Sequence, residues 1–126
     1  MSGAVVVDSS VVIAWQDKTH PRHADAETHL LATGPDFAMH GLNLAEVLVG
    51  LDEVEWPAFR SLLEALGFRF LATSPERLAK TRRRSGLKMP DACVLALAEA
   101  TTARAVLTLD QRLASTARAE GFTVYS

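Results

Sequence analysis

The sequence contains one cysteine, Cys93, so it excludes an internal disulfide bond. Cys93 lies within the apolar run ACVLALA, a setting typical of a small buried side chain. A catalytic thiol needs a positive, partly exposed setting and a nearby histidine, and the neighbouring sequence supplies neither. We therefore expect Cys93 to be a core residue.

Long apolar runs and a strong net charge are also absent. The longest apolar runs are too short to span a bilayer, and no basic segment followed by a long apolar stretch marks a signal peptide. These features predict a cytoplasmic protein with no membrane segment. The 13 basic and 15 acidic residues give a net charge of −2, so any contact with nucleic acid must come from a local basic patch.

Several common functional motifs are missing. The sequence has no P-loop, no glycine-rich nucleotide motif and no Ser-His-Asp arrangement. The four histidines are not spaced as metal ligands; they are His20, His23, His29 and His40. Nucleotide binding, serine hydrolase chemistry and a histidine metal site are therefore not indicated.

The hydrophobic pattern predicts an α/β fold in a single domain over residues 1–126, with no repeat or linker. The predicted strands cover residues 4–8, 36–40, 68–72, 104–109 and 122–126. The predicted helices cover residues 10–17, 19–34, 43–51, 56–67, 74–83, 89–102 and 110–121. Because strands alternate with helices, we expect a parallel sheet of about five short strands with helices on both faces, a three-layer sandwich.

Helix-capping signals accompany several of these segments. Ser9 or Ser10 is expected to cap the helix near residue 10, and Ser74 the helix that begins at Pro75. Asn43 and Glu46 have the spacing of a capping box.

Four acidic residues lie where strands end or helices begin. Asp8 ends the first strand and Asp110 follows the fourth, whereas Glu46 and Asp91 lie early in helices. Each of them, taken alone, could be an N-cap or a favourable charge in a first helical turn. Because parallel strands end at one edge of the sheet, we expect the four carboxylates to meet there, where they would repel one another. A Mg²⁺ or Mn²⁺ ion would relieve that repulsion, so the sequence predicts a metal site.

Four segments together resemble the PIN-domain ribonucleases, and in particular the toxin subunits of bacterial VapBC toxin–antitoxin pairs. They are VVVDSSVVIAW, LNLAEVLVGL, LKMPDACVLALA and VLTLDQRL, in order over nearly the whole chain. The resemblance implies a Mg²⁺- or Mn²⁺-dependent endoribonuclease whose catalytic and metal-binding acids are Asp8, Glu46, Asp91 and Asp110. It also implies supporting roles for Ser9 and Thr108.

The same resemblance implies the partners: a small antitoxin protein, an RNA substrate and a second copy of the chain in a homodimer. Many relatives carry a further acid near the fourth one, but here Gln111 and Arg112 follow Asp110. This departure leaves open whether one or two metal ions bind.

The basic stretch KTRRRSGLK precedes Asp91. It could be a solvated helix end, where cations suit the helix dipole, or a rim that contacts phosphates. We expect Arg84 and Lys88 to contact RNA.

Other functions remain as alternatives. A receiver-like phosphoacceptor domain would need a carboxylate pair at the first strand, and a phosphatase with an aspartate nucleophile would need an acid two residues after Asp8, where Ser10 stands. A non-catalytic PIN-fold domain that only binds a partner is also possible, although the full set of four acids argues against it.

Overall fold

The computed structural model describes residues 3–126, and within them five parallel strands form one sheet in the order β3-β2-β1-β4-β5. The strands are β1 (Val5–Val7), β2 (Phe37–His40), β3 (Phe68–Leu71), β4 (Ala105–Leu107) and β5 (Val124–Tyr125). β1 lies at the centre, and Val6 is in register with Ala38 of β2 and Val106 of β4. The predicted parallel sheet of about five short strands is confirmed.

The central strands are buried on both faces because their side chains alternate between two apolar cores. Val5 and Val7 belong to the first core, whereas Val6 belongs to the second. In β2, Phe37 and Met39 face the first core and Ala38 the second. Helices therefore have to cover both faces of the sheet.

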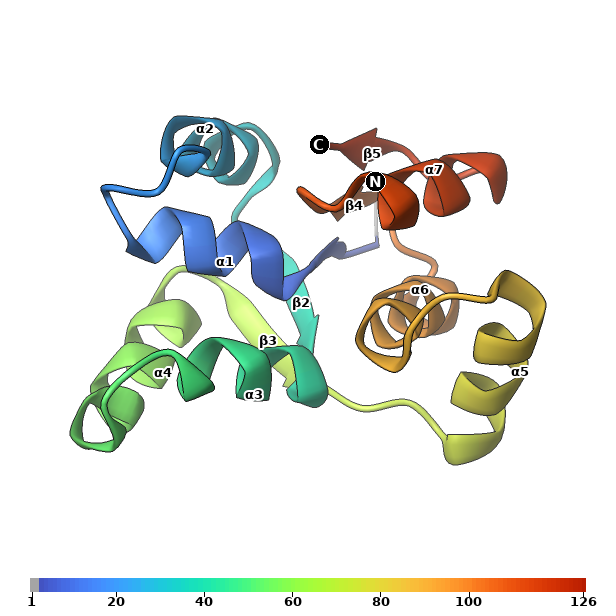
Figure 1. Cartoon of the computed structure of the whole chain (residues 1–126), viewed down its shortest axis with the longest axis horizontal. Coiled ribbons are helices and arrows are strands. Elements are labelled where there is room, and N and C mark those ends of the chain that lie inside the picture. Colours follow the sequence, from blue (N-terminus) through green and yellow to red (C-terminus); the bar gives the residue numbers. More distant parts are fainter. Residues whose placement is uncertain (1–2) are drawn as a thin grey trace.

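Four helices and one short 3₁₀ helix build the first layer. They are α1 (Ser9–Gln16), α2 (His23–Thr33), α3 (Gly41–Val49), η1 (Glu53–Glu55) and α4 (Trp56–Ala65). The second layer consists of α5 (Pro75–Ser85), α6 (Met89–Thr101) and α7 (Gln111–Ala119). Figure 1 shows α1–α4 on the left of the strands and α5–α7 on the right, so the predicted three-layer arrangement is confirmed.

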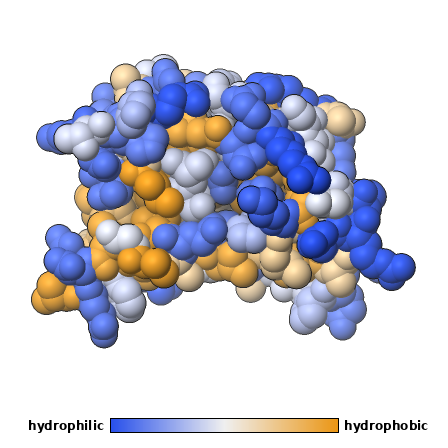
Figure 2. Space-filling view, in the orientation of Figure 1, coloured by the Kyte–Doolittle hydropathy of each residue, from blue (hydrophilic) through white to orange (hydrophobic). Residues whose placement is uncertain are grey.

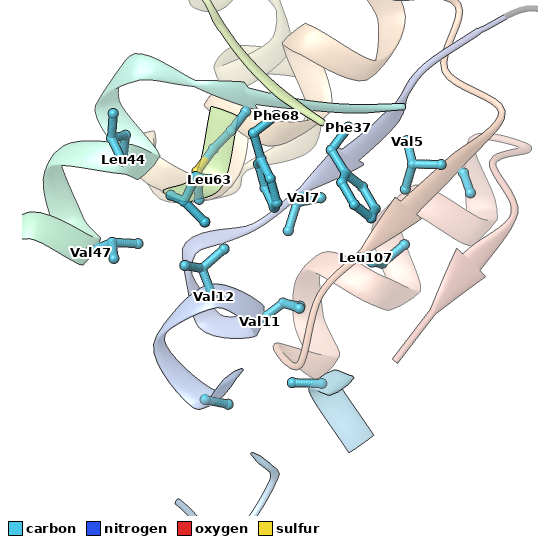
Figure 3. Packing of buried hydrophobic residues seen from close by; sticks show 14 residues of the cluster. Val5, Val7, Val11, Val12, Phe37, Leu44, Val47, Leu63, Phe68 and Leu107 are labelled. Carbon is cyan, nitrogen blue, oxygen red and sulfur yellow. The ribbon is translucent and has the colours of Figure 1, made fainter. Parts of the chain in front are cut away.

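The first core packs β-branched and aromatic side chains from the sheet against aliphatic ones from the helices (Figure 3). The rings of Phe37 and Phe68 lie 4.7 Å apart on neighbouring strands, and Val11 and Leu63 bring α1 and α4 onto them. Burial of one such aliphatic side chain contributes about 1.5–3 kcal/mol relative to exposure. This packing fixes where α1 and α3 begin, next to the carboxyl ends of β1 and β2.

Several local predictions need correction. The first helix begins at Ser9, so Asp8 and not a serine occupies the N-cap position. Residues 19–22 are not helical, and Pro21 lies before α2. The 3₁₀ helix η1 was not predicted, because EVE has no apolar periodicity to indicate it. The capping of α5 by Ser74, which accepts a hydrogen bond from the Arg77 N–H at 3.1 Å, is confirmed.

A glycine is required at residue 67, where α4 ends and β3 begins. Its φ is +104°, a conformation that other residues rarely adopt, and an added Cβ would lie 1.7 Å from the carbonyl oxygen of Pro35. This close approach lets β3 start directly beside β2.

The two helical layers differ in surface character. In Figure 2, hydrophobic residues cover much of the left half, where α1, α3 and α4 lie, and hydrophilic residues cover much of the right half, where α5 and α7 lie. No helix within residues 3–126 is long and apolar enough to cross a membrane.

Candidate active site

Asp8 lies directly after β1, and its carboxylate is held by hydroxyl groups from two parts of the chain. Oδ2 accepts hydrogen bonds from Ser10 Oγ at 2.7 Å and from Thr108 Oγ1 at 2.8 Å. The residue is only 3% exposed. Asp8 occupies the N-cap position of α1, but its side chain makes no capping bond to that helix, so capping does not account for the placement of its carboxylate.

Asp110 is tied to Asp8 through the loop after β4. Thr108 Oγ1, which donates to Asp8, accepts a hydrogen bond from the Asp110 N–H at 3.0 Å. Ser10 Oγ likewise accepts from the Leu109 N–H at 3.0 Å. Asp110 Oδ1 accepts from the Leu113 N–H at 2.9 Å, so Asp110 caps α7. The carboxyl ends of β1 and β4 are thereby locked together.

Glu46 reaches the same edge from the second turn of α3. Its Oε1 accepts hydrogen bonds from Ser9 Oγ at 2.9 Å and from Asn43 Nδ2 at 3.2 Å. The capping-box interpretation of Asn43 is wrong, because His40 occupies the N-cap position and its Nδ1 accepts from the Leu42 N–H at 3.1 Å.

Asp91 lies in the first turn of α6, where the helix dipole favours an anion. Burial, followed by the charges of Asp110, Asp8 and Glu46, raises the pKa of Asp91 to about 6, and the Lys88 charge partly opposes that rise. The site therefore disfavours a fourth negative charge when no cation is present.

The pKa of Asp8 is also affected by the neighbouring acids. Burial raises it above its ordinary value, the hydrogen bonds from Ser10 and Thr108 lower it, and the charges of Glu46 and Asp110 raise it. The four carboxylates thus lie close enough for their charges to act on one another. Their roles as ligands and catalytic groups stay predictions.

The oxygen chemistry of this site suits a small, partly hydrated divalent cation. Within residues 3–126, no group of three or more His, Cys, Asp or Glu side chains is placed so that it could hold a metal ion as it stands. Mg²⁺ does not require such a group, because it keeps several waters and commonly uses one or two carboxylates. Asp8 Oδ2, Glu46 Oε1 and Asp110 Oδ1 are engaged by neutral donors. Among residues 3–126, the second carboxylate oxygens of Glu46 and Asp110 have no hydrogen bond, and Asp8 Oδ1 accepts only a 3.5 Å bond from Ser9 Oγ, so these oxygens are available to such an ion.

The basic residues near the site differ in the ion pairs and hydrogen bonds that they form. Arg84 forms ion pairs with Glu99 at 2.6 Å and with Glu120 at 2.9 Å, so it links α5 to α6 and to the C-cap of α7. Those contacts do not favour RNA contact by Arg84. Lys88 is exposed and its charge acts on Asp91. Arg112, which sequence reasoning did not select, donates to the Gly86 carbonyl oxygen at 3.2 Å on the same side.

Two polar residues of the site were missed as site residues by sequence reasoning. Ser10 was taken only as a helix cap, and Asn43 only as half of a capping box. Their serine and asparagine types are common at helix starts, so local sequence could not separate the two roles. Cys93 is buried as predicted, and burial together with the Glu46 charge raises the pKa of its thiol to about 11.

A separate groove lies on the first helical layer, between the end of α1, α2 and the η1–α4 segment. Exposed apolar side chains line it, among them Val54 and Leu62, together with Trp15 and Phe59. A neighbouring hollow adds Leu31 and Leu66. Contiguous exposed apolar surface of this kind commonly marks a site of protein–protein contact.

Comparison with known proteins identifies the family. The sequence model of the PIN domain matches residues 5–119, nearly the whole chain. The chain belongs to the PIN domain family. The four acids of this PIN domain all lie within the matched residues.

Solved structures have the same fold. A toxin–antitoxin complex from Klebsiella pneumoniae is 24% identical with a TM-score of 0.70, covering 86% of this PIN domain and 88% of the other chain. The sarcin–ricin-loop-cleaving toxin VapC20 of Mycobacterium tuberculosis is 15% identical with a TM-score of 0.74, covering 95% and 97% of the two chains. A protein from Pyrobaculum aerophilum is 20% identical with a TM-score of 0.58, covering 99% and 91%. No curated protein sequence matches this PIN domain.

Proposed function

We propose that this PIN domain is a metal-dependent endoribonuclease, a hydrolase of phosphodiester bonds, and the toxin of a toxin–antitoxin pair. The observation that carries the proposal is that Asp8, Glu46 and Asp110, whose charges act on Asp91, accept side-chain hydrogen bonds only from neutral donors within residues 3–126. An acid cluster used only for stability would be paired with Lys or Arg, but the ion pairs within residues 3–126 lie elsewhere. Two structural relatives, a toxin–antitoxin complex and a sarcin–ricin-loop-cleaving toxin, support the same function.

In this proposal Asp8, Glu46, Asp91 and Asp110 hold a Mg²⁺ or Mn²⁺ ion. When bound, such an ion activates water and neutralises charge on phosphate oxygens. Ser10 and Thr108 orient Asp8, and Ser9 orients Glu46, so that a fixed pair of carboxylates faces the substrate phosphate. Burial and the neighbouring acids raise the pKa of Asp91 to about 6, so this residue would have to lose its proton to serve as a metal ligand.

The exposed Lys88 beside Asp91 is proposed to bind an RNA phosphate next to the acids. Its positive charge would draw a polyanion towards a site that otherwise repels it. Arg84 is the weaker candidate, because two glutamates already engage its guanidinium group.

We propose a small antitoxin as the protein partner, since an uncontrolled ribonuclease would harm its host cell. Its inhibitory segment would place an Arg or Lys among the four acids, where a cation can stand in for the metal. The apolar groove lined by Val54 and Leu62 would receive apolar side chains of the same partner. We also propose that residues 1–126 form a single nuclease domain and that two copies of the chain form a homodimer.

The deciding experiment incubates the purified, partner-free protein with total RNA, with Mn²⁺, with Mg²⁺ or with a chelator. Asp36→Asn serves as a matched control, because Asp36 is an exposed acid paired with Arg69 away from the site. We expect cleavage by the wild type and the control only when metal is present. A protein that leaves RNA intact under all metal conditions contradicts the ribonuclease proposal and favours a non-catalytic PIN domain.

A further inference from the structure

We propose that Asn43 is a positioning residue that holds Glu46 and the first turn of α6, which carries Asp91, in a fixed relation. The inference rests on the proposed metal-dependent function. It concerns a side chain that neither the acid pattern nor the family resemblance assigned to the site.

One nitrogen atom of Asn43 contacts both Glu46 and the backbone next to Asp91. Nδ2 donates to Glu46 Oε1 at 3.2 Å and to the carbonyl oxygen of Pro90 at 3.1 Å. Pro90 immediately precedes Asp91, so the second bond holds the backbone from which the Asp91 side chain projects. Because Asn43 is 0% exposed, water cannot easily replace either bond.

The two hydrogen bonds that Nδ2 donates determine the orientation of the Asn43 side-chain amide. Asn43 Oδ1 is buried and has no hydrogen-bond partner among the described residues. Turning the amide over would place this oxygen against two acceptors, Glu46 Oε1 and the Pro90 carbonyl. The structure therefore keeps an unsatisfied oxygen in order to direct Nδ2 at both acceptors.

The chemical type of this donor also matters. Ser9, from α1, and Asn43, from α3, both donate to Glu46 Oε1, so one carboxylate oxygen is held from two sides. Both donors are neutral and leave the negative charge of Glu46 available to a metal ion. A lysine or arginine at position 43 would hold the carboxylate equally well but would compete with the metal for its charge.

A purely structural role for Asn43 would be a tie between α3 and α6. The chain provides a matched example of such a tie in Thr81, which is also buried and donates to Glu99 Oε1 at 2.8 Å, linking α5 to α6 away from the acids. The two roles make different predictions: a positioning residue affects metal binding by folded protein, whereas a tie affects only stability.

The test compares Asn43→Leu, which has the same branched shape and no donor, and the smaller Asn43→Ala with Thr81→Val and Asp8→Asn. Mn²⁺ binding is measured by titration calorimetry on protein shown to be folded by circular dichroism. Urea unfolding gives the stability of each variant. RNA cleavage is measured as a function of Mn²⁺ concentration.

We expect the Asn43 variants to bind Mn²⁺ about 10–100-fold more weakly, as is usual when a residue that orients a metal ligand is removed. Raised Mn²⁺ should restore part of their cleavage. Thr81→Val should bind Mn²⁺ within about twofold of wild type whatever its stability, because its hydrogen bond is remote from the acids.

Wild-type affinity in both Asn43 variants, with binding lost in Asp8→Asn, would overturn the positioning role and leave the proposed function standing. A wild-type protein that binds no Mn²⁺ would instead overturn the proposed function, and this inference with it. The two failures are therefore distinguishable in one set of titrations.

Discussion

Thr108 donates its hydroxyl hydrogen to Oδ2 of Asp8 at 2.8 Å, although the two residues are 100 positions apart in the chain. The same hydroxyl oxygen accepts from the Asp110 N–H. Because Thr108 is completely buried, its hydroxyl oxygen fixes the position of Asp8 relative to Asp110. The Thr108 hydroxyl therefore contributes both to the folded structure and to the proposed arrangement of the acids.

Thr108→Val keeps the shape of the side chain but removes both hydrogen bonds. We expect RNA cleavage to fall about 10–100-fold, because Asp8 loses an orienting donor. The free energy of unfolding should fall by about 1–3 kcal/mol, because the partly buried Asp110 N–H loses its acceptor and the buried Asp8 carboxylate loses a donor. Cleavage assays and urea denaturation check these two effects. Thr108→Ser restores the hydroxyl and should recover most of the activity; equal activity in the valine variant would contradict the role.

Asp8→Asn tests whether the charge of Asp8 is needed for RNA cleavage in a protein that still folds. Asparagine can still accept from Ser10 and Thr108 but carries no charge. We expect cleavage to fall more than about 100-fold, beyond the effect of losing an orienting residue. Metal-free stability should hold or rise, since repulsion among the remaining acids is relieved.

The metal dependence of the melting temperature provides the second measurement for Asp8→Asn. A ligand that binds only the native state raises this temperature, so Mn²⁺ should stabilise the wild type and stabilise the variant much less. An N-cap alone would behave differently, because asparagine caps as well as aspartate. A variant that cuts RNA at the wild-type rate with an unchanged Mn²⁺ response would remove Asp8 from the site.

The raised pKa of Asp91 predicts a pH dependence of stability in the metal-free protein. The carboxyl titrates at about 6 in the native state and near 3.8 when unfolded, so between these values the native state binds more protons. Stability therefore falls as pH rises from about 4 to 6 and does not recover above that range. Because Asp91 is only partly buried and solvent screens its interactions, the loss from this group should be on the order of 1–2 kcal/mol, less than the full shift would give. Urea denaturation with a chelator at several pH values measures the slope.

Asp91→Asn removes the titrating group and should flatten that slope, with Asp36→Asn as the control that leaves it unchanged. Metal affinity should depend on pH in the opposite direction from stability. Because a ligand must lose its proton, wild-type Mn²⁺ affinity should weaken as pH falls below about 6. Affinity that is constant from pH 5 to 7.5 would contradict a role for Asp91 as a ligand.

Lys88 and Arg84 should behave differently when replaced by alanine. Lys88→Ala should weaken RNA binding and reduce the slope of log affinity against log salt by about 1, as expected for one lost phosphate contact. Arg84→Ala should leave binding within about twofold and cost about 0.5–1 kcal/mol of stability, because Arg84 itself is exposed although its two glutamate partners are partly buried. Binding to a non-cleavable RNA, measured at several salt concentrations, tests both; a larger binding loss in Arg84→Ala would reverse the assignment.

The apolar groove should matter for the partner and not for catalysis. Val54→Asp and Leu62→Asp place a charge on exposed groove residues and should weaken capture of a co-expressed antitoxin at least about 10-fold. RNA cleavage by the free protein should stay within about twofold. Val49→Asp is the control, because Val49 is equally exposed on α3 but does not line the groove. Equal capture by all three variants would place the antitoxin elsewhere.

The strands and most helices could be predicted because their apolar residues follow the periods of buried strands and amphipathic helices. Asp8 and Asp110 could be placed at one edge because each follows an apolar strand of a parallel sheet. The bond from Asn43 to the Pro90 carbonyl could not be predicted, since it joins residues 47 positions apart through a contact between helices. The same holds for Arg84, whose partner Glu120 lies 36 positions away.

The central place of β1 has a consequence for synthesis of the chain. β1 pairs with β4, and Asp8 obtains its Thr108 donor and its Asp110 neighbour only through that pairing. A growing chain that has reached residue 104 already contains Asp8, Glu46 and Asp91, but it lacks β4 and the loop that aligns them. The acid site therefore cannot assemble while the first four-fifths of the polypeptide are being made, and any nuclease activity begins only after the last segment is added.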